Sequence, residues 1–203
     1  MNKLIACVVV ATALLAVSRT AEAVTQFKAI ITHTQEVSNP PIPDEGSSGI
    51  GFFELNDAQT ALSYDVTLTG LDLDGNQTPG NANDNVTRTH FHAAAAGING
   101  GIVFGQIDAS PTLRNDLDDL VVNPVTGRIT GVWDNAEGNG TTLQAQLANL
   151  LAGNLYFNVH TADHGGGEIR GQVLPVPEPS TVALFGCGIV GLIAVARRAR
   201  RTA

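Results

Sequence analysis

Hydrophobic and polar residues alternate with period 2 over most of the chain between residues 27 and 174, which predicts a series of short β-strands. Strands are expected at 27–32, 48–55, 60–69, 87–93, 102–107, 128–133, 155–160 and 169–173. Segments rich in proline or glycine, such as 39–43 and 97–101, interrupt the pattern and predict turns or irregular loops. Many short strands separated by turn signals indicate a mainly β fold, an antiparallel β-sandwich or barrel.

The segment 141–152 has the period of a helix instead. Its leucines fall at i, i+4, i+7 and i+8 and so share one face of that helix: Leu143, Leu147, Leu150 and Leu151. Thr141 or Thr142 is expected to cap the start of the helix, and Gly153 is expected to follow its end. The segment 113–120 fits either a loop or a short helix.

The last two predicted strands enclose a polar loop that contains His164 and the glycine run 165–167. Period 2 places Glu168 and Arg170 on one face, where they are expected to form an ion pair that supports the loop. The glycines are expected to provide a positive φ or a close backbone approach. We therefore expect replacement of the central Gly166 by valine to destabilise the fold.

A pair of histidines provides the main candidate for chemistry. His90 and His92 lie two residues apart in a predicted strand, so they share a face with Phe91 opposite. If His160 arrives from a neighbouring strand, three imidazoles form a nitrogen-only site suited to copper or zinc. The alternative is that these histidines bond to backbone carbonyls or line a polar pocket. Residues 24–175 contain no cysteine and no Gly-x-Ser-x-Gly motif, so no catalytic residue is predicted.

A long polar loop begins with the spacing Asp72-x-Asp74-x-Asn76, which invites a calcium interpretation. An EF-hand loop needs glycine at its sixth position and glutamate at its twelfth, where this chain has Gln77 and Asn83. Aspartate and asparagine also favour turns by bonding to their own backbone. We therefore predict a solvated loop.

Both ends of the chain differ in composition from the middle. Residues 1–23 combine a basic start, an apolar run and a small-x-small site, which predicts a signal peptide cut by signal peptidase after Ala23. Residues 181–196 form a second apolar run, and it is followed by four arginines in 197–201. This run predicts a transmembrane segment with its basic flank in the cytoplasm. The domain itself is then expected to be 24–175.

The charge of that domain excludes some partners. Residues 24–175 contain five basic and seventeen acidic residues, a net charge of −12, so nucleic acid and anionic membrane surfaces are not expected to bind. Cys7 and Cys187 both lie in the apolar ends, so the exported domain must be stabilised without disulfides.

The middle of the chain resembles the CHRD domain, first described in chordin and common in exported bacterial proteins. The matching segments are Phe27–Ala29, Gln35–Val37, His90–His92, Gly97–Gly100, Tyr156–Thr161 and Gly167–Gln172. The resemblance covers about 27–174 and implies a β-sandwich-like fold, immunoglobulin-like or superoxide-dismutase-like. It implies no established enzymatic activity.

The tail 176–203 resembles the PEP-CTERM sorting signal. Pro177, Glu178 and Pro179 carry the motif, ahead of the apolar run and the arginines. The resemblance implies a transient anchor in the inner membrane, recognition and cleavage by an exosortase, and delivery to the cell surface or an exopolysaccharide matrix.

Copper–zinc superoxide dismutase provides a third likeness. In that family an H-x-H strand and a later Val-His segment with an acidic residue surround the copper, and His90, His92, Val159-His160 and Asp163 are similar in order. The bridging and zinc-site histidines and the cysteine pair are missing, so the likeness implies at most a mononuclear site.

Two functional hypotheses follow from the sequence. The first is a non-enzymatic, exported surface or matrix domain with a binding or structural role. The second is a protein that binds copper or zinc, with or without redox activity, through His90, His92 and His160.

Overall fold

The computed structural model describes residues 25–176, which form one sheet of nine strands, a 3-10 turn and one α-helix. The elements are β1 (Thr25–Thr32), η1 (His33–Gln35), β2 (Ser48–Leu55), β3 (Ala61–Thr69), β4 (Val86–Ala93), β5 (Gly101–Gly105), β6 (Val121–Asn123), β7 (Arg128–Asp134), α2 (Leu143–Leu151), β8 (Leu155–Thr161) and β9 (Ile169–Pro175).

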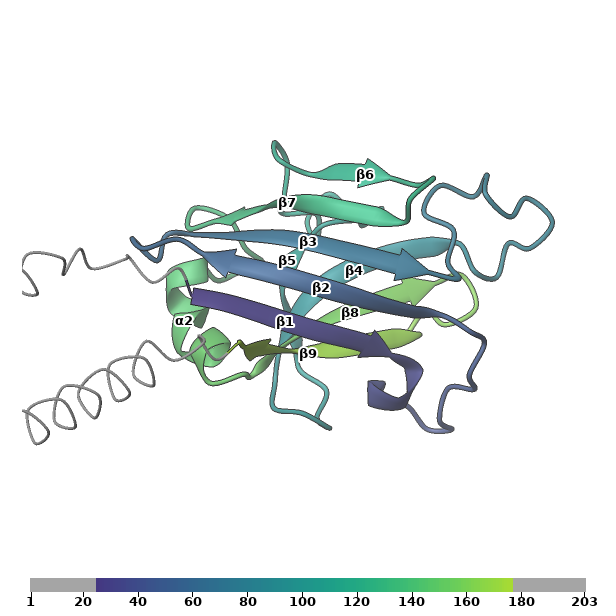
Figure 1. The fold of residues 1–203 in the computed structure, drawn as a ribbon, viewed down its shortest axis with the longest axis horizontal. Helices are drawn as coiled ribbons and strands as arrows, with labels where there is room; N and C mark the ends of the chain where they lie inside the picture. Colours follow the sequence, from purple (N-terminus) through teal and green to yellow (C-terminus); the bar gives the residue numbers. More distant parts are fainter. Residues whose placement is uncertain (1–24, 177–203) are drawn as a thin grey trace, which may run out of the picture.

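The strands follow the order β5-β4-β8-β9-β1-β2-β3-β7-β6, and every neighbouring pair of strands is antiparallel. The sheet curls into a half-barrel, so that β1, β2 and β3 lie across from β4 and β8 (Figure 1). The prediction of a mainly antiparallel β fold with one short helix is confirmed.

An aromatic cluster joins the two sides of the half-barrel. The ring of Phe91, on β4, lies 5.4 Å from that of Phe53 on β2 and 5.7 Å from that of Trp133 on β7, measured between ring centroids. Trp133 in turn stacks on Phe104 at 4.8 Å. All four side chains are buried. Each contributes about 1.5–3 kcal/mol through removal of its apolar surface from water.

The helix forms where its leucine spacing predicts it. Thr142 is the N-cap, and its Oγ1 accepts a hydrogen bond from the backbone N–H of Ala145 at 3.2 Å. Gly153 follows the helix with φ +70°, the left-handed conformation that ends many helices. Leu143 and Leu150 are fully buried, so the apolar face covers an end of the core. The structure thus confirms both predicted ends of this helix.

The sequence left one segment open and missed another. Residues 113–120 contain no helix, and the carboxylate of Asp116 in this segment instead accepts a hydrogen bond from the Tyr64 hydroxyl. Strand β6 was not predicted, because three residues are too few to show a period.

The loop that follows β3 is organised around the buried side chain of Asp72. Its two carboxylate oxygens accept hydrogen bonds from four backbone N–H groups at 2.8–3.0 Å, those of Asp74, Gly75, Gln77 and Thr78. Burial opposes the charge of Asp72, but these donors outweigh it and hold the pKa of the carboxyl well below its usual range. The carboxylate that the calcium interpretation would use as a ligand is therefore already occupied by hydrogen bonds from the protein.

Candidate metal centre

Strand pleating separates the apolar core from a polar layer on the outer face of β4 and β8. Phe91 on β4 and Phe157 on β8 point inward, and their rings pack edge to face at 5.5 Å. The alternate residues His90, His92 and His160 point the other way. This layer is also buried, because loops cover it, and the three histidines are only 0–8% exposed. The prediction that His90 and His92 share a face is confirmed.

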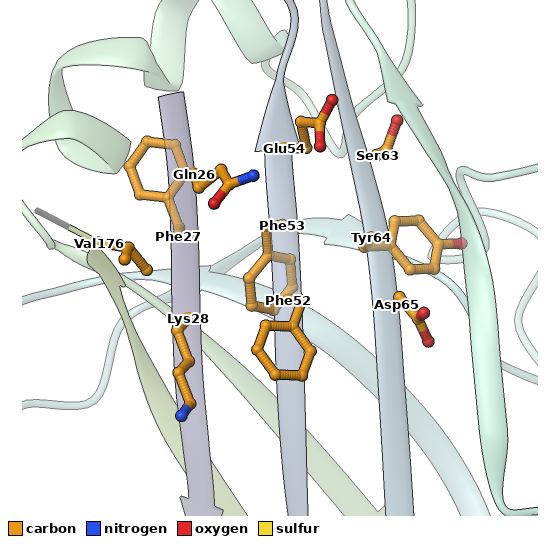
Figure 2. A pocket seen from close by; sticks show the side chains of 10 residues that line it. All are labelled: Gln26, Phe27, Lys28, Phe52, Phe53, Glu54, Ser63, Tyr64, Asp65 and Val176. Carbon is orange, nitrogen blue, oxygen red and sulfur yellow. The ribbon is translucent and has the colours of Figure 1, made fainter. Parts of the chain in front are cut away.

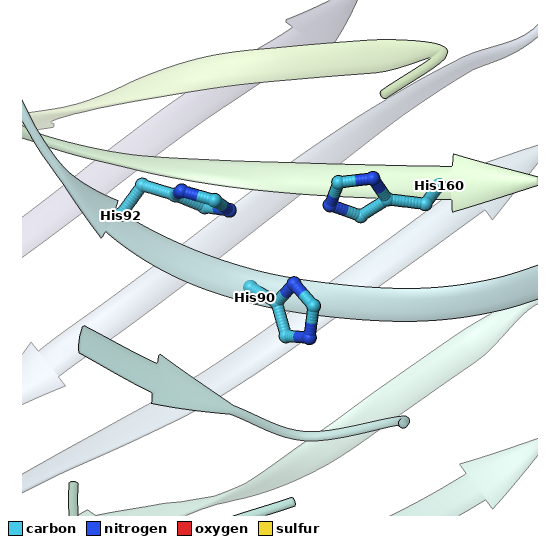
Figure 3. A group of neighbouring side chains, drawn as sticks. All are labelled: His90, His92 and His160. Atoms are coloured by element: carbon cyan, nitrogen blue, oxygen red, sulfur yellow. The ribbon is translucent and has the colours of Figure 1, made fainter. Parts of the chain in front are cut away.

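The three imidazole rings meet in one place. Ring centroids lie 5.7 Å apart for His90 and His92, 5.1 Å for His90 and His160, and 6.1 Å for His92 and His160. Figure 3 shows the rings directed toward one another, two from β4 and one from β8. One nitrogen from each ring lies within 4.8 Å of the others. The sheet thus brings together all three histidines proposed from the sequence.

The outer nitrogen of each ring has a hydrogen-bond acceptor, which fixes the tautomer. Nδ1 of His92 donates to the Gly100 carbonyl at 2.9 Å, and Nδ1 of His160 donates to the Gly165 carbonyl at 3.1 Å. Nε2 of His90 donates to the Asp108 carboxylate at 2.8 Å. The remaining nitrogens, Nδ1 of His90 and Nε2 of the other two, are buried without any partner. In a neutral ring these nitrogens carry lone pairs.

Burial keeps the three rings neutral. It lowers the pKa of His92 to about 4, and the charges of His90 and Arg170 act in the same direction against the Gly100 hydrogen bond. Burial likewise lowers the pKa of His160 to about 4, helped by the charge of His90. The pKa of His90 is also lowered by burial, although Asp108 opposes that shift. At neutral pH three unprotonated nitrogens therefore face a common point.

A stack of three planar groups closes one side of the site. The Tyr156 ring lies parallel to that of His92, with centroids 4.9 Å apart, and the Arg170 guanidinium sits 3.8 Å from the Tyr156 centroid. Arg170 donates to the Asn99 side chain and the Ile98 carbonyl at 3.0 and 3.1 Å. The predicted ion pair between Arg170 and Glu168 is wrong: Arg170 lies in no ion pair among residues 25–176. Arg170 instead ties the loop before β5 to the stack.

Residues 27–173 match the CHRD domain family. The chain belongs to the CHRD domain family. Residues 175–201 match the PEP-CTERM protein-sorting motif. No curated protein and no solved structure matched the chain.

Most of the segments that resemble the CHRD domain in sequence converge on this polar layer of the fold. The Gly97–Gly100 turn supplies the acceptor for His92, and the segment Tyr156–Thr161 supplies both His160 and the stacked ring. From the start of the domain, the Gln35 side chain accepts a hydrogen bond from the backbone N–H of Gln172 at 3.2 Å. Phe27–Ala29 is the exception, because Phe27 and Ala29 pack into the apolar core instead.

The tight glycine corner of the CHRD domain lies at Gly167 and not at Gly166. Gly167 has φ +128°, and a Cβ there would lie 2.7 Å from Oε2 of Glu36 and 2.8 Å from the Asn158 amide nitrogen. A Cβ on Gly166 would meet nothing within 4 Å. The expectation that Gly166 is the sensitive position is therefore wrong, because the loop turns one residue later.

The other two histidines lie outside the site. His33 approaches Asp44 at 3.5 Å, and His164 approaches Glu45 at 3.4 Å. Asp163, the acidic residue matched to superoxide dismutase, forms a surface group with Glu45 and His164 and is not a ligand candidate for the three-histidine site.

Sequence reasoning missed Asp108, the partner of His90. This aspartate follows β5 by three residues, and its separation of 18 residues from His90 matches no motif. It also missed Asn158 and Glu36, whose side chains meet beside Gly167.

Several predictions concern residues that the structure does not describe. The signal peptide 1–23, the sorting residues Pro177, Glu178 and Pro179, and the apolar run 181–196 lie outside 25–176. Within the described part of the chain, no helix is long and apolar enough to cross a membrane.

Proposed function

We propose that this CHRD domain binds one transition-metal ion, copper or zinc, through His90, His92 and His160. The observation that supports the proposal is the set of three buried imidazole nitrogens that have no partner and face one another. Metal-bound histidines usually donate their other ring N–H to a carboxylate or a carbonyl, and each of these three does so.

The alternative, purely structural histidines, explains the outer nitrogens but not the inner ones. A buried acceptor left without a partner costs about 1–3 kcal/mol. Three such atoms in one place are a large cost for a fold of ordinary stability, and a single ion would satisfy all of them. Their neutral state at pH 7 also matches what a metal requires of its ligands.

The donor set limits the choice of ion. Imidazole nitrogen suits zinc and copper, whereas calcium and magnesium need oxygen ligands. Bonds of about 2.0–2.1 Å to a tetrahedral zinc place ligand nitrogens about 3.4 Å apart. The nitrogens here lie within 4.8 Å, so small ring rotations would complete such a site.

Metal stoichiometry tests this function. The purified protein is titrated with copper or zinc, desalted and measured by elemental analysis, together with His92→Ala and the matched control His33→Ala. We expect one ion per chain for the wild type and for the His33 variant, and a large loss for the His92 variant. Near-zero metal in the wild-type protein would contradict the proposal.

The cellular context follows from the two sequence matches. A CHRD domain followed by a PEP-CTERM motif marks an exported, surface-sorted protein. Our proposal adds that residues 181–196 hold the precursor in the inner membrane until an exosortase removes the tail.

A second candidate function, adhesion to an exopolysaccharide, is supported by a groove on the outer face of β1, β2 and β3 (Figure 2). Phe52 is 51% exposed at its centre, with the Lys28 ammonium 5.6 Å from its ring. Gln26, Glu54 and Ser63 add hydrogen-bonding groups at the rim. An exposed ring among such groups would bind the apolar face of a neutral sugar.

Phe52→Ala should reduce retention on the polysaccharide, whereas Val125→Ala, at another exposed position, should not.

A further inference from the structure

Two more buried atoms near the three histidines have no hydrogen-bond partner. They are Oδ1 of Asn158 and Oε2 of Glu36. Together with the three ring nitrogens they make five unpartnered atoms in one polar layer, and all five are acceptors. What the layer needs is therefore a cation together with a group that donates hydrogen bonds.

Asn158 lies close to the histidines in the fold, and Glu36 lies close to Asn158. Asn158 is paired with His90 across β4 and β8, and it precedes His160 by two residues on the same strand face. Opposite residues in an antiparallel pair have Cβ atoms about 4.5–5.5 Å apart. Asn158 therefore lies beside two of the three ligands.

Gly167 leaves open the space between Asn158 and Glu36. The point that a Cβ of Gly167 would occupy lies 2.7 Å from the Glu36 carboxylate and 2.9 Å from Oδ1 of Asn158. A side chain at this position would stand between the two acceptors, so only glycine leaves both of them accessible from one place. A single donor in this region would reach both of them.

The charge around the site favours an electron-rich ligand. Arg170 is 1% exposed, yet its hydrogen bonds go to neutral oxygens, and among the described residues it forms no ion pair. Carboxylates of the same layer, on Glu36, Asp108 and Glu168, balance this guanidinium. The ion itself would have only neutral nitrogen ligands, so an oxygen ligand with lone pairs is attracted to it.

We propose, on the basis of the metal site proposed above, that the ion carries an exchangeable water, whose protons are accepted by Asn158 and Glu36. Water fits because both atoms only accept, so a halide or another aprotic ligand would leave them unpaired. Three protein ligands and one water is the arrangement of zinc sites that exchange ligands, whereas structural sites have four protein ligands. The centre is thus an open one.

The experiment is electron spin echo spectroscopy on the full chain loaded with Cu(II) in D₂O. Modulation from ¹⁴N reports the remote nitrogens of bound histidines, and modulation from ²H reports a bound water. Wild type should show both signals. Asn158→Leu should keep the nitrogen signals and lose the bound deuterons, whereas Asn83→Leu, in the exposed polar loop, should keep both.

The outcomes separate the two proposals. Absence of histidine nitrogen signals in the wild type would overturn the metal site itself. Nitrogen signals without a bound deuteron in the wild type would leave the metal site intact and overturn the water. A bound deuteron that is unchanged in Asn158→Leu and also in Glu36→Leu would overturn the assignment of these two acceptors.

Discussion

The carboxylate of Asp108 lies 2.8 Å from Nε2 of His90, and both side chains are shielded from water. This contact fixes the ring with its Nδ1 lone pair toward His92 and His160.

We expect Asp108→Ala to weaken copper or zinc binding by about 10–100-fold, the usual effect of losing such a partner of a metal ligand. Competition with a chromophoric chelator measures the change. Asp65→Ala, which removes an exposed partner of Arg128, is the control, and equal affinities in the two variants would contradict the assignment.

Acid should destabilise the metal-free protein in a defined pH range. His92 and His160 have pKa values of about 4 in the folded state and about 6.5 when unfolded. Between these values the unfolded chain binds more protons, so stability is lost as pH falls from about 6.5 to about 4. Each histidine contributes up to about 1.4 kcal/mol per pH unit.

Thermal unfolding at a series of pH values measures this loss. The His92→Gln variant should show a shallower dependence than the wild type, while His33→Gln should follow the wild-type curve. Parallel curves for the wild type and His92→Gln would show that burial does not set the protonation of this ring.

The glycine corner provides a paired test. Gly167→Ala forces a side chain into a positive φ beside Glu36 and should cost about 1–3 kcal/mol of unfolding free energy. Gly166→Ala adds a methyl group in open space and should change it by less than about 0.5 kcal/mol. Urea denaturation of both variants compares the two values. A harmless Gly167→Ala would mean that the loop has room to relax.

The loop around Asp72 should depend on that carboxylate and not on calcium. Asp72→Ala leaves four backbone N–H groups without their acceptor and should lower the Tm clearly, whereas Asp57→Ala, in the exposed β2–β3 turn, should not. Calcium added to the wild type should leave the Tm unchanged. A rise in Tm with calcium would restore the calcium interpretation.

Processing of the tail is tested on material released from the cell surface. We expect a mature C-terminus near Pro177–Pro179, because the sorting motif precedes the apolar run and the arginines. Intact-mass spectrometry identifies that C-terminus. Surface protein that retains Arg200 would favour a permanent membrane anchor.

Local patterns in the sequence were sufficient for most elements of the fold. Period 2 predicted eight of the strands because each has one face in the core, and leucine spacing with Thr142 and Gly153 predicted the helix. Period 2 also placed His90 and His92 on one face. Strand β6 and the irregular segment 113–120 were not resolved by sequence, since short or loop structure depends on contacts from elsewhere, such as that of Tyr64 with Asp116.

Only the tertiary structure decided what the histidines face. Pairing of β4 with β8 brings His160 to His90 across 70 residues of chain, and loop closure supplies Asp108, Gly100 and Gly165 as their acceptors. These partners have no common sequence spacing, because each comes from a different loop. The neutrality of the rings likewise arises from burial under those loops, a property that no local pattern records.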